Sequence, residues 1–271
     1  MKLDAHQDKI AAYGREFYEE TVPGALRSAR AIVPIVLAHL PVRSAVDIGC
    51  GHGAWLHALE ECDVTDIIGY DGTYVDQSKL LMHPANFRVI DLRDAFEIDR
   101  TFELAISLEV AEHLPKRLAQ QFIQRLVSAA PIVLFSAAIP GQIGHYHINV
   151  QWQDYWRSIF KTFGFHPVDL VRPHIWGHSD VEYWYQQNII LYCSDEALGA
   201  NECLRPVPHD VSLNIVHPSL YCIQRPRRFE EEQQKHWEGQ IERGSKSVFW
   251  YFSLLSKALR AKARRRLSRS A

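Results

Sequence analysis

The chain has 271 residues and a formal net charge of −2, with 47% hydrophobic and 23% charged residues. This composition is typical of a globular protein with a sizeable core, and it excludes a general electrostatic attraction to nucleic acid or anionic membranes. The five cysteines are odd in number and contain no CxxC pair, so they indicate neither a disulfide framework nor a cysteine-bound zinc site. Because the first residues also lack an apolar signal-peptide core, we expect a cytoplasmic protein.

Apolar periodicity predicts two N-terminal helices, at 5–20 and 25–40, followed by strands that alternate with helices. Strands are expected at 44–49, 66–71, 86–91, 101–108, 131–138, 165–172 and 186–194. Helices are expected at 54–62, 75–82, 116–129 and 151–164. Such alternation predicts an α/β fold with a mostly parallel sheet.

The pattern divides the chain into three predicted parts. Residues 1–40 form an N-terminal helical segment, which could fold over a ligand as a lid. Residues 41–195 form the α/β domain. Residues 196–271 form a C-terminal extension whose last part, 257–269, carries seven basic residues and no acidic one.

A glycine-rich loop, Asp47-Ile-Gly-Cys-Gly-His-Gly53, follows the first predicted strand. Glycines at such a position let the backbone turn tightly and approach a ligand closely. The pattern also fits the G-x-G-x-x-A fingerprint of dinucleotide-binding proteins, so a nicotinamide-dependent oxidoreductase stays open here. Asp47 would crowd a pyrophosphate but suits a ligand with an ammonium group. Carboxylates at two further strand ends, Asp71 and Asp91, could hold ribose hydroxyls and an adenine amino group.

The segments AVDIGCGHGAWL, IIGYDGTYVD, NFRVIDL and ISLEVAEHL resemble, in order and spacing, the motifs of class I S-adenosylmethionine-dependent methyltransferases. The resemblance covers roughly residues 25–195. It implies a seven-stranded Rossmann-like sheet with helices on both faces and an antiparallel last strand. It also implies S-adenosylmethionine as cofactor and S-adenosylhomocysteine as product.

The same resemblance assigns the cofactor-binding residues by position. The glycine loop would pass the methionine part of the cofactor, the second strand end would bind the ribose, and the third would face the adenine. Glu109, after the fourth strand, would border the methyl-donor pocket. The predicted cofactor-binding residues are Asp47, Gly49, Gly51, Gly53, Asp71, Gly72, Asp91, Leu92 and Glu109.

The loop IPGQIGHYHINVQW follows the fifth predicted strand, at the sheet edge where open α/β folds bind ligands. Methyl transfer to a hydroxyl needs a base, and histidine has a suitable unperturbed pKa. His147 is the predicted base, with His145 and His113 as further catalytic candidates. His145, His147 and Asn149 alternate, so an extended loop would place them on one side. The segments FSAAIPGQ, RPHIW and YWYQQNIILY resemble those of a bacterial subgroup of these methyltransferases, in which an acidic residue is expected after the asparagine of this loop. Val150 stands at that position here and the loop supplies no carboxylate, so a metal site is not predicted.

Substrate contacts are predicted at Asn149, Gln151, Trp152 and Trp176. The second half of the chain resembles a bacterial subgroup associated with polysaccharide or natural-product biosynthesis. We therefore expect O-methylation of a hydroxyl on a small glycan or natural product. N-methylation, an RNA-directed methyltransferase that uses the basic tail, and a protein without catalysis remain alternatives. The tail could also contact a membrane surface or form a homodimer.

Overall fold

The computed structural model describes residues 15–94, 96–224 and 235. The chain divides into two units, residues 1–220 and 221–271, and the fold below is that of the first unit. The basic tail at 257–269 lies outside the described residues, so its predicted partners stay predictions. Among the described residues, one helical stretch, Thr21–His39, is long and apolar enough to cross a membrane, by length and composition only.

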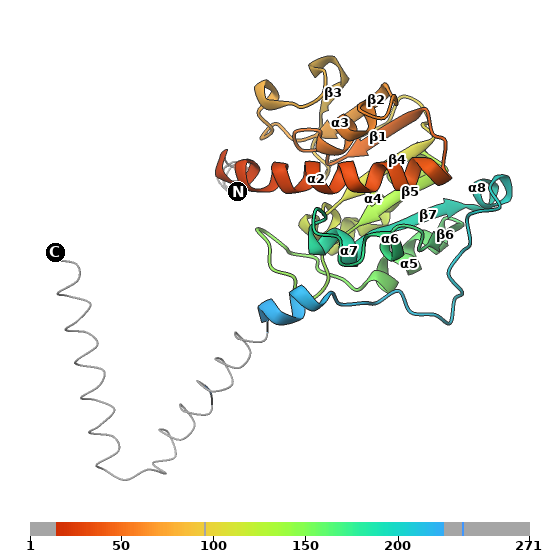
Figure 1. Ribbon diagram of the computed structural model, residues 1–271. Helices are drawn as coiled ribbons and strands as arrows, with labels where there is room; N and C mark the ends of the chain where they lie inside the picture. The colour runs from red at the N-terminus through yellow and green to blue at the C-terminus, as the bar shows by residue number, and fades with distance from the viewer. Residues whose placement is uncertain (1–14, 95, 225–234, 236–271) are drawn as a thin grey trace, which may run out of the picture. The chain divides into compact units, whose positions relative to one another are not determined.

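A seven-stranded sheet in the order β3-β2-β1-β4-β5-β7-β6 forms the centre of this unit (Figure 1). Its strands are β1 (Ser44–Ile48), β2 (Asp66–Asp71), β3 (Phe87–Val89), β4 (Leu104–Leu108), β5 (Ile132–Ser136), β6 (Phe165–Val168) and β7 (Ile190–Ser194). Strands β1 to β5 pair in parallel, whereas β7 runs antiparallel to both of its neighbours. The predicted Rossmann-like sheet with an antiparallel last strand is confirmed.

Side chains alternate between the two faces of the sheet and build two cores. In β4, Leu104 and Ile106 join one cluster and Ala105 joins the other. The first cluster is covered by α2 (Arg15–His39), α3 (Ala54–Glu60), α6 (Arg172–Ile175), α7 (Tyr183–Asn188) and α8 (Asp195–Ala200). The second is covered by α4 (Ala119–Ala129) and α5 (Gln153–Thr162). The predicted helical layers on both faces are therefore present.

The structure corrects three details of the predicted elements. From Arg15 to His39 the chain forms one helix, α2, which contains Pro23 and Pro34, so the break expected between residues 20 and 25 is absent, and residues 5–14 lie outside the described residues. The helix expected at 75–82 is reduced to a 3₁₀ turn at Gln77–Lys79, where the Asp76 side chain caps the backbone N–H of Ser78. The last strand begins at Ile190 rather than at residue 186. The preceding residues belong to α7, because their side chains hydrogen-bond inside the protein instead of alternating across the sheet.

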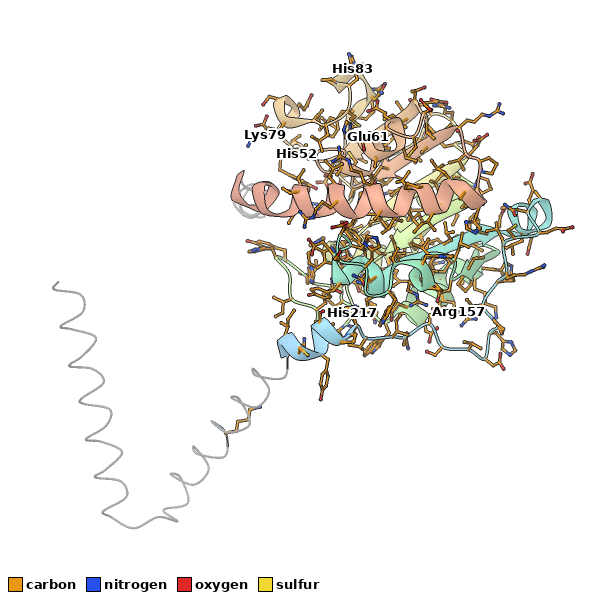
Figure 2. All side chains as sticks on the ribbon, in the orientation of Figure 1. His52, Glu61, Lys79, His83, Arg157 and His217 are labelled. Carbon is orange, nitrogen blue, oxygen red and sulfur yellow. The ribbon has the colours of Figure 1, made fainter. Side chains whose placement is uncertain are left out.

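Residues 207–214 lie against α5 and are held by its side chains. Arg157 donates hydrogen bonds to the carbonyls of Val207, Pro208 and Val211 at 2.6–3.0 Å. Figure 2 shows Arg157 and His217 in the lower part of the view, toward β6 and β7, and His52 and Lys79 in the upper part, toward β2 and β3. Part of the predicted C-terminal extension therefore packs on the α/β core.

Stacked aromatic rings fill the second core beneath β5 and β7. The Phe160 and Tyr192 rings lie 3.7 Å apart and almost parallel, and Phe160 is fully buried. Phe135 contacts both rings at centroid distances of 5.3 and 6.1 Å. The attachment of α5 to the sheet thus depends on close packing of these rings.

Truncation of this stack should measure its contribution to stability. We expect Phe160→Ala to lower the free energy of unfolding by about 3–5 kcal/mol, because it removes a buried ring and leaves a cavity. Val211→Ala, at a side chain that is 48% exposed, should change it by less than about 0.5 kcal/mol. Chemical denaturation followed by circular dichroism checks both values. Equal effects of the two substitutions would contradict the packing described.

Candidate active site

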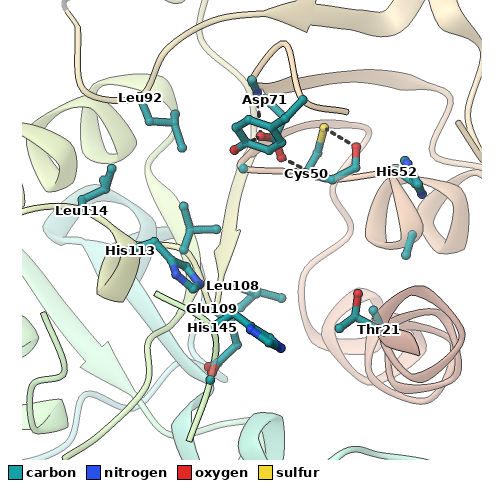
Figure 3. A pocket seen from close by; sticks show the side chains of 18 of the residues that line it. Thr21, Cys50, His52, Asp71, Leu92, Leu108, Glu109, His113, Leu114 and His145 are labelled. Carbon is teal, nitrogen blue, oxygen red and sulfur yellow. Dashed lines mark hydrogen bonds between the residues drawn. The ribbon is translucent and has the colours of Figure 1, made fainter. Parts of the chain in front are cut away.

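A cavity of about 510 Å³ lies at the carboxyl ends of the central strands. Its walls come from the glycine loop after β1, the ends of β2 and β4, and the loop after β5. Thr21 and Val22 of α2 form part of the wall. Figure 3 shows Asp71 and Cys50 on one side of this space, His113 and His145 on another, and Thr21 on a third.

Ten of the sixteen predicted site residues line this cavity, and six do not. Those that line it are Gly49, Gly51, Asp71, Gly72, Asp91, Leu92, Glu109, His113, His145 and His147. Those outside its lining are Asp47, Gly53, Asn149, Gln151, Trp152 and Trp176. The structure therefore brings together most of the predicted cofactor residues and all three predicted catalytic histidines, and it separates them from the predicted substrate residues.

The glycine loop needs backbone conformations that other residues avoid. Gly49, Gly51 and Gly53 have φ angles of 90°, 53° and 81°. A Cβ added to Gly49 would lie 2.5 Å from a methyl carbon of Val110, so the loop approaches the turn after β4 as closely as a glycine allows. Gly49 and Gly51 line the cavity together with Cys50 and His52 of the same loop.

The carboxylate of Asp71 holds the glycine loop at the end of β2. It accepts hydrogen bonds from the backbone N–H of Gly51 and of Gly72, both at 2.6 Å, and from the Tyr74 hydroxyl at 2.5 Å. The side chain is 4% exposed. Asp71 thus joins the ends of β1 and β2 and turns one oxygen toward a hydroxyl donor.

The other two predicted carboxylates have different surroundings. Asp91, just beyond β3, is bound by the guanidinium of Arg93 through two of its nitrogens. Asp47 is 2% exposed within β1, and burial raises its pKa well above the usual value, with the Asp71 charge adding to the effect.

An amide network surrounds the carboxylate of Glu109, which follows β4 with a positive φ of 56°. Gln142 donates to one carboxylate oxygen at 2.6 Å and Asn188 donates to the other at 3.1 Å. Asn188 and Gln187 also donate to the side-chain oxygen of Gln142. Burial raises the pKa of Glu109, and the hydrogen bonds from Asn188 and Gln142 oppose that shift.

Glu112 is the residue of this region that the sequence pattern did not single out. Its side chain is completely buried, and the described residues offer its carboxylate oxygens no donor with normal hydrogen-bond geometry, although the carboxyl groups of Glu112 and Glu109 interact directly. Burial raises its pKa well above the usual value, and the charge of Glu109 adds to this. Its Oε1 lies 3.9 Å from Nε2 of His147.

The histidine loop after β5 does not keep the alternation expected of an extended chain. Tyr146 has a φ of 55°, which reverses the backbone between His145 and His147. His145 is exposed, His147 has 13% of its side chain exposed, and Asn149 is buried against the carbonyl of Ala111. The expectation that these three residues share one side is therefore wrong, although both histidines reach the cavity.

Two predicted substrate residues, Trp152 and Trp176, are 41% and 44% exposed and lie away from the cavity. Trp176 instead packs against His217, with ring centroids 4.8 Å apart. Several residues that line the cavity were not predicted as site residues from the sequence. They are the aromatic residues Trp55, Trp184 and Tyr185, together with Gln142 and Thr21.

Comparisons with known proteins identify the family and support the fold. Residues 18–170, more than half of the chain, match the family described as "Methyltransferase domain". Among curated proteins, none matches the chain. Among solved structures, an O-methyltransferase described as putative, from Nostoc punctiforme, matches with 14% identity and a TM-score of 0.50. That match covers 66% of this chain and 59% of the Nostoc protein, and it supports the fold.

Two further solved structures match with TM-scores of 0.48. A plantazolicin methyltransferase in complex with SAH is 13% identical, and the match covers 70% of this chain and 91% of that one. A sugar N-methyltransferase from a Streptoalloteichus species is also 13% identical, and the match covers 62% of this chain and 87% of that one. From the family match over residues 18–170, the chain belongs to the methyltransferase-domain family and is an S-adenosylmethionine-dependent methyltransferase.

Proposed function

We propose that the chain methylates a hydroxyl group of a small acceptor, with a glycan or another natural product as the acceptor class. The observation that carries this proposal is the position of Glu112, His113 and His147. These three side chains, called the histidine cluster below, lie beside the cavity that the glycine loop and Asp71 also border. The residues proposed to bind the cofactor and the side chains that could assist deprotonation therefore border the same cavity.

The glycine side of the cavity fits the cofactor. Gly49 and Gly51 line it, and a Cβ at Gly49 would collide with Val110, so this wall keeps its shape only with glycine there. One oxygen of Asp71 already accepts a hydroxyl hydrogen bond from Tyr74, and a ribose hydroxyl would take that place. The apolar side chain of Leu92 and the Asp91–Arg93 pair would border the adenine. Bound here, S-adenosylmethionine supplies an electrophilic methyl group.

The opposite side of the cavity fits an acceptor with a hydroxyl group. The Nδ1 of His147 lies 3.3 Å from the carbonyl of Gln142, and only the tautomer with a proton on Nδ1 can donate to that oxygen. The lone pair then lies on Nε2. Burial lowers the pKa of His147, opposed by its hydrogen bond to Gln142, and nearby His145 adds to the lowering. A neutral imidazole at this place supports activation of a hydroxyl, and the assignment of His147 as base stays a prediction.

Alanine at Gly49 should weaken cofactor binding without unfolding the protein. The new methyl group meets Val110 and must adopt a φ near 90°, which displaces the loop from its close approach. We expect the Kd for S-adenosylhomocysteine to rise at least about tenfold, measured by isothermal titration calorimetry. Asp71→Asn should also raise it, because the amide cannot accept all three hydrogen bonds. Unchanged Kd values in both variants would show that the cofactor binds elsewhere.

The acceptor side should be tested with labelled S-adenosylmethionine and a panel of sugars, phenols and amino sugars. His147→Ala should reduce methyl transfer about 10²–10⁴-fold, the range typical of assisted proton transfer. The control is His166→Ala, because His166 forms a surface pair with Asp195 at 2.8 Å.

The affinity of His147→Ala for S-adenosylhomocysteine should stay unchanged. Transfer to amines alone would contradict the proposed hydroxyl acceptor. Full activity of His147→Ala would contradict the role of the histidine cluster.

A further inference from the structure

The three side chains of the histidine cluster come from two segments that meet at the sheet edge. Glu112 and His113 belong to the 3₁₀ turn Ala111–His113 after β4, and His147 belongs to the loop after β5. One ligand-type atom of each residue lies within 4.8 Å of the others. The rings of His113 and His147 are 5.0 Å apart. Two imidazoles and one carboxylate therefore converge on one point.

Glu112 has no positively charged residue beside it among the described residues. Its completely buried carboxylate has no donor with normal hydrogen-bond geometry there, and its close neighbour is the carboxyl group of Glu109, so the ionised form is costly unless a cation compensates its charge. The nearby carboxylate of Glu109 has its own donors, Gln142 and Asn188. Among the described residues, no lysine or arginine pairs with Glu112. A bound cation would supply the missing charge at its oxygens.

Both histidines have the second contact that metal ligands usually make. The Nδ1 atoms of His113 and His147 each lie 3.3 Å from a backbone carbonyl, those of Tyr146 and Gln142. Donation from Nδ1 orients each ring and places its lone pair on Nε2. Ligating histidines almost always carry such an outer hydrogen bond. The arrangement is therefore more ordered than two histidines that meet by chance on a surface.

The backbone fixes the distance between the two segments. The carbonyl of Glu112 accepts hydrogen bonds from the N–H groups of Ile148 and Asn149, both at 2.9 Å. These bonds hold the residues after His147 against the 3₁₀ turn. A Cβ on Gly144 would overlap the His147 imidazole, so the loop also closes tightly over that ring.

We propose that Glu112, His113 and His147 bind a divalent cation of the Zn²⁺ or Mn²⁺ class. Two imidazoles and one carboxylate suit these ions better than Mg²⁺, which prefers oxygen ligands alone. Bonds of about 2.0–2.1 Å in a tetrahedral site place ligand atoms about 3.4 Å apart. Side-chain rotations that shorten the present separations by roughly an ångström would complete the site.

The cation gives the histidine cluster a chemical role that rests on the proposed function. The acceptor hydroxyl would take a remaining coordination position, and the metal would lower its pKa. The O–H bond then breaks, its electron pair stays on the metal-bound oxygen, and the proton passes to solvent. His147 acts in this arrangement as a ligand to the cation and not as the base predicted from the sequence.

Metal binding by the purified full chain tests the inference without any acceptor. After treatment with a chelator and its removal, Zn²⁺ and Mn²⁺ are titrated by calorimetry. Co²⁺ is added as a spectroscopic probe of coordination by nitrogen and oxygen. We expect one tight site per chain for wild type. Glu112→Gln, which keeps the shape of the side chain and removes its charge, should raise the Kd at least about 100-fold, as should His147→Ala.

The matched control is His166→Ala, which removes an exposed histidine beside a carboxylate and should leave the tight site intact. Thermal unfolding without metal verifies the fold of each variant. Glu112→Gln should be as stable as wild type or more stable, because an amide is cheaper to bury than a carboxylate.

Absence of the site in wild type, or equal affinity in Glu112→Gln, would overturn the inference. S-adenosylhomocysteine binding and methyl transfer in chelated protein are measured in parallel. Methyl transfer by the chelated protein would be consistent with the proposed function but would contradict a role of the cation in catalysis.

Discussion

The two hydrogen bonds from Ile148 and Asn149 to the carbonyl of Glu112 determine the geometry of the active site. They connect the turn after β4 with the loop after β5, two segments that neighbouring parallel strands bring to the same sheet edge. Side-chain contacts such as that of Gln142 with Glu109 also hold the loop, but these two bonds are the ones that join it to the residue beside His113. With these bonds, His147 lies within 4 Å of a buried carboxylate, and the cavity gains a polar wall opposite the glycine loop.

A second constraint on the site is the hydrogen-bond network around Glu109. The positive φ of Glu109 turns its carboxylate toward the side chains of Gln142 and Asn188, which bring together the loop after β5 and the end of α7. Backbone strain of this kind persists only where the surroundings fix it, and here the amide network does so. The network reaches Gln187, whose side-chain oxygen accepts the N–H of His217. The last described part of the first unit thereby supports the site.

The fold could be predicted because its signals are local and redundant. Apolar strands end in Asp71 and near Asp91, and a glycine loop follows Ile48. Their alternation with helices predicted a mostly parallel sheet, and the resemblance to class I methyltransferases supplied the strand number and the cofactor side. The errors arose where tertiary contacts decide. The buried amides of α7 look like the start of a strand, and the left-handed residue Tyr146 destroys the period of two that placed Asn149 beside the histidines.

The histidine cluster also depends on tertiary contacts that the sequence does not reveal. The loop after β5 lacks a carboxylate, so its sequence gave no reason to predict a metal site. The missing carboxylate is Glu112, which stands 35 positions before His147 and meets it only because β4 and β5 are neighbours. Trp176 was predicted to touch substrate from its place between His174 and His178 in a glycine-containing turn, and the structure places its ring against that of His217. The residue types indicated which side chains could act in catalysis, whereas the strand order decides which of them lie together in one site.

The most direct measurement is an experimental structure of the chain with S-adenosylhomocysteine and a hydroxyl-bearing acceptor. It should show the homocysteine portion along Gly49 and Gly51 and the ribose on Asp71. The sulfur atom should face the acceptor oxygen, and that oxygen should lie beside the histidine cluster. An acceptor bound away from Glu112, His113 and His147, or a cofactor outside the cavity, would contradict the account.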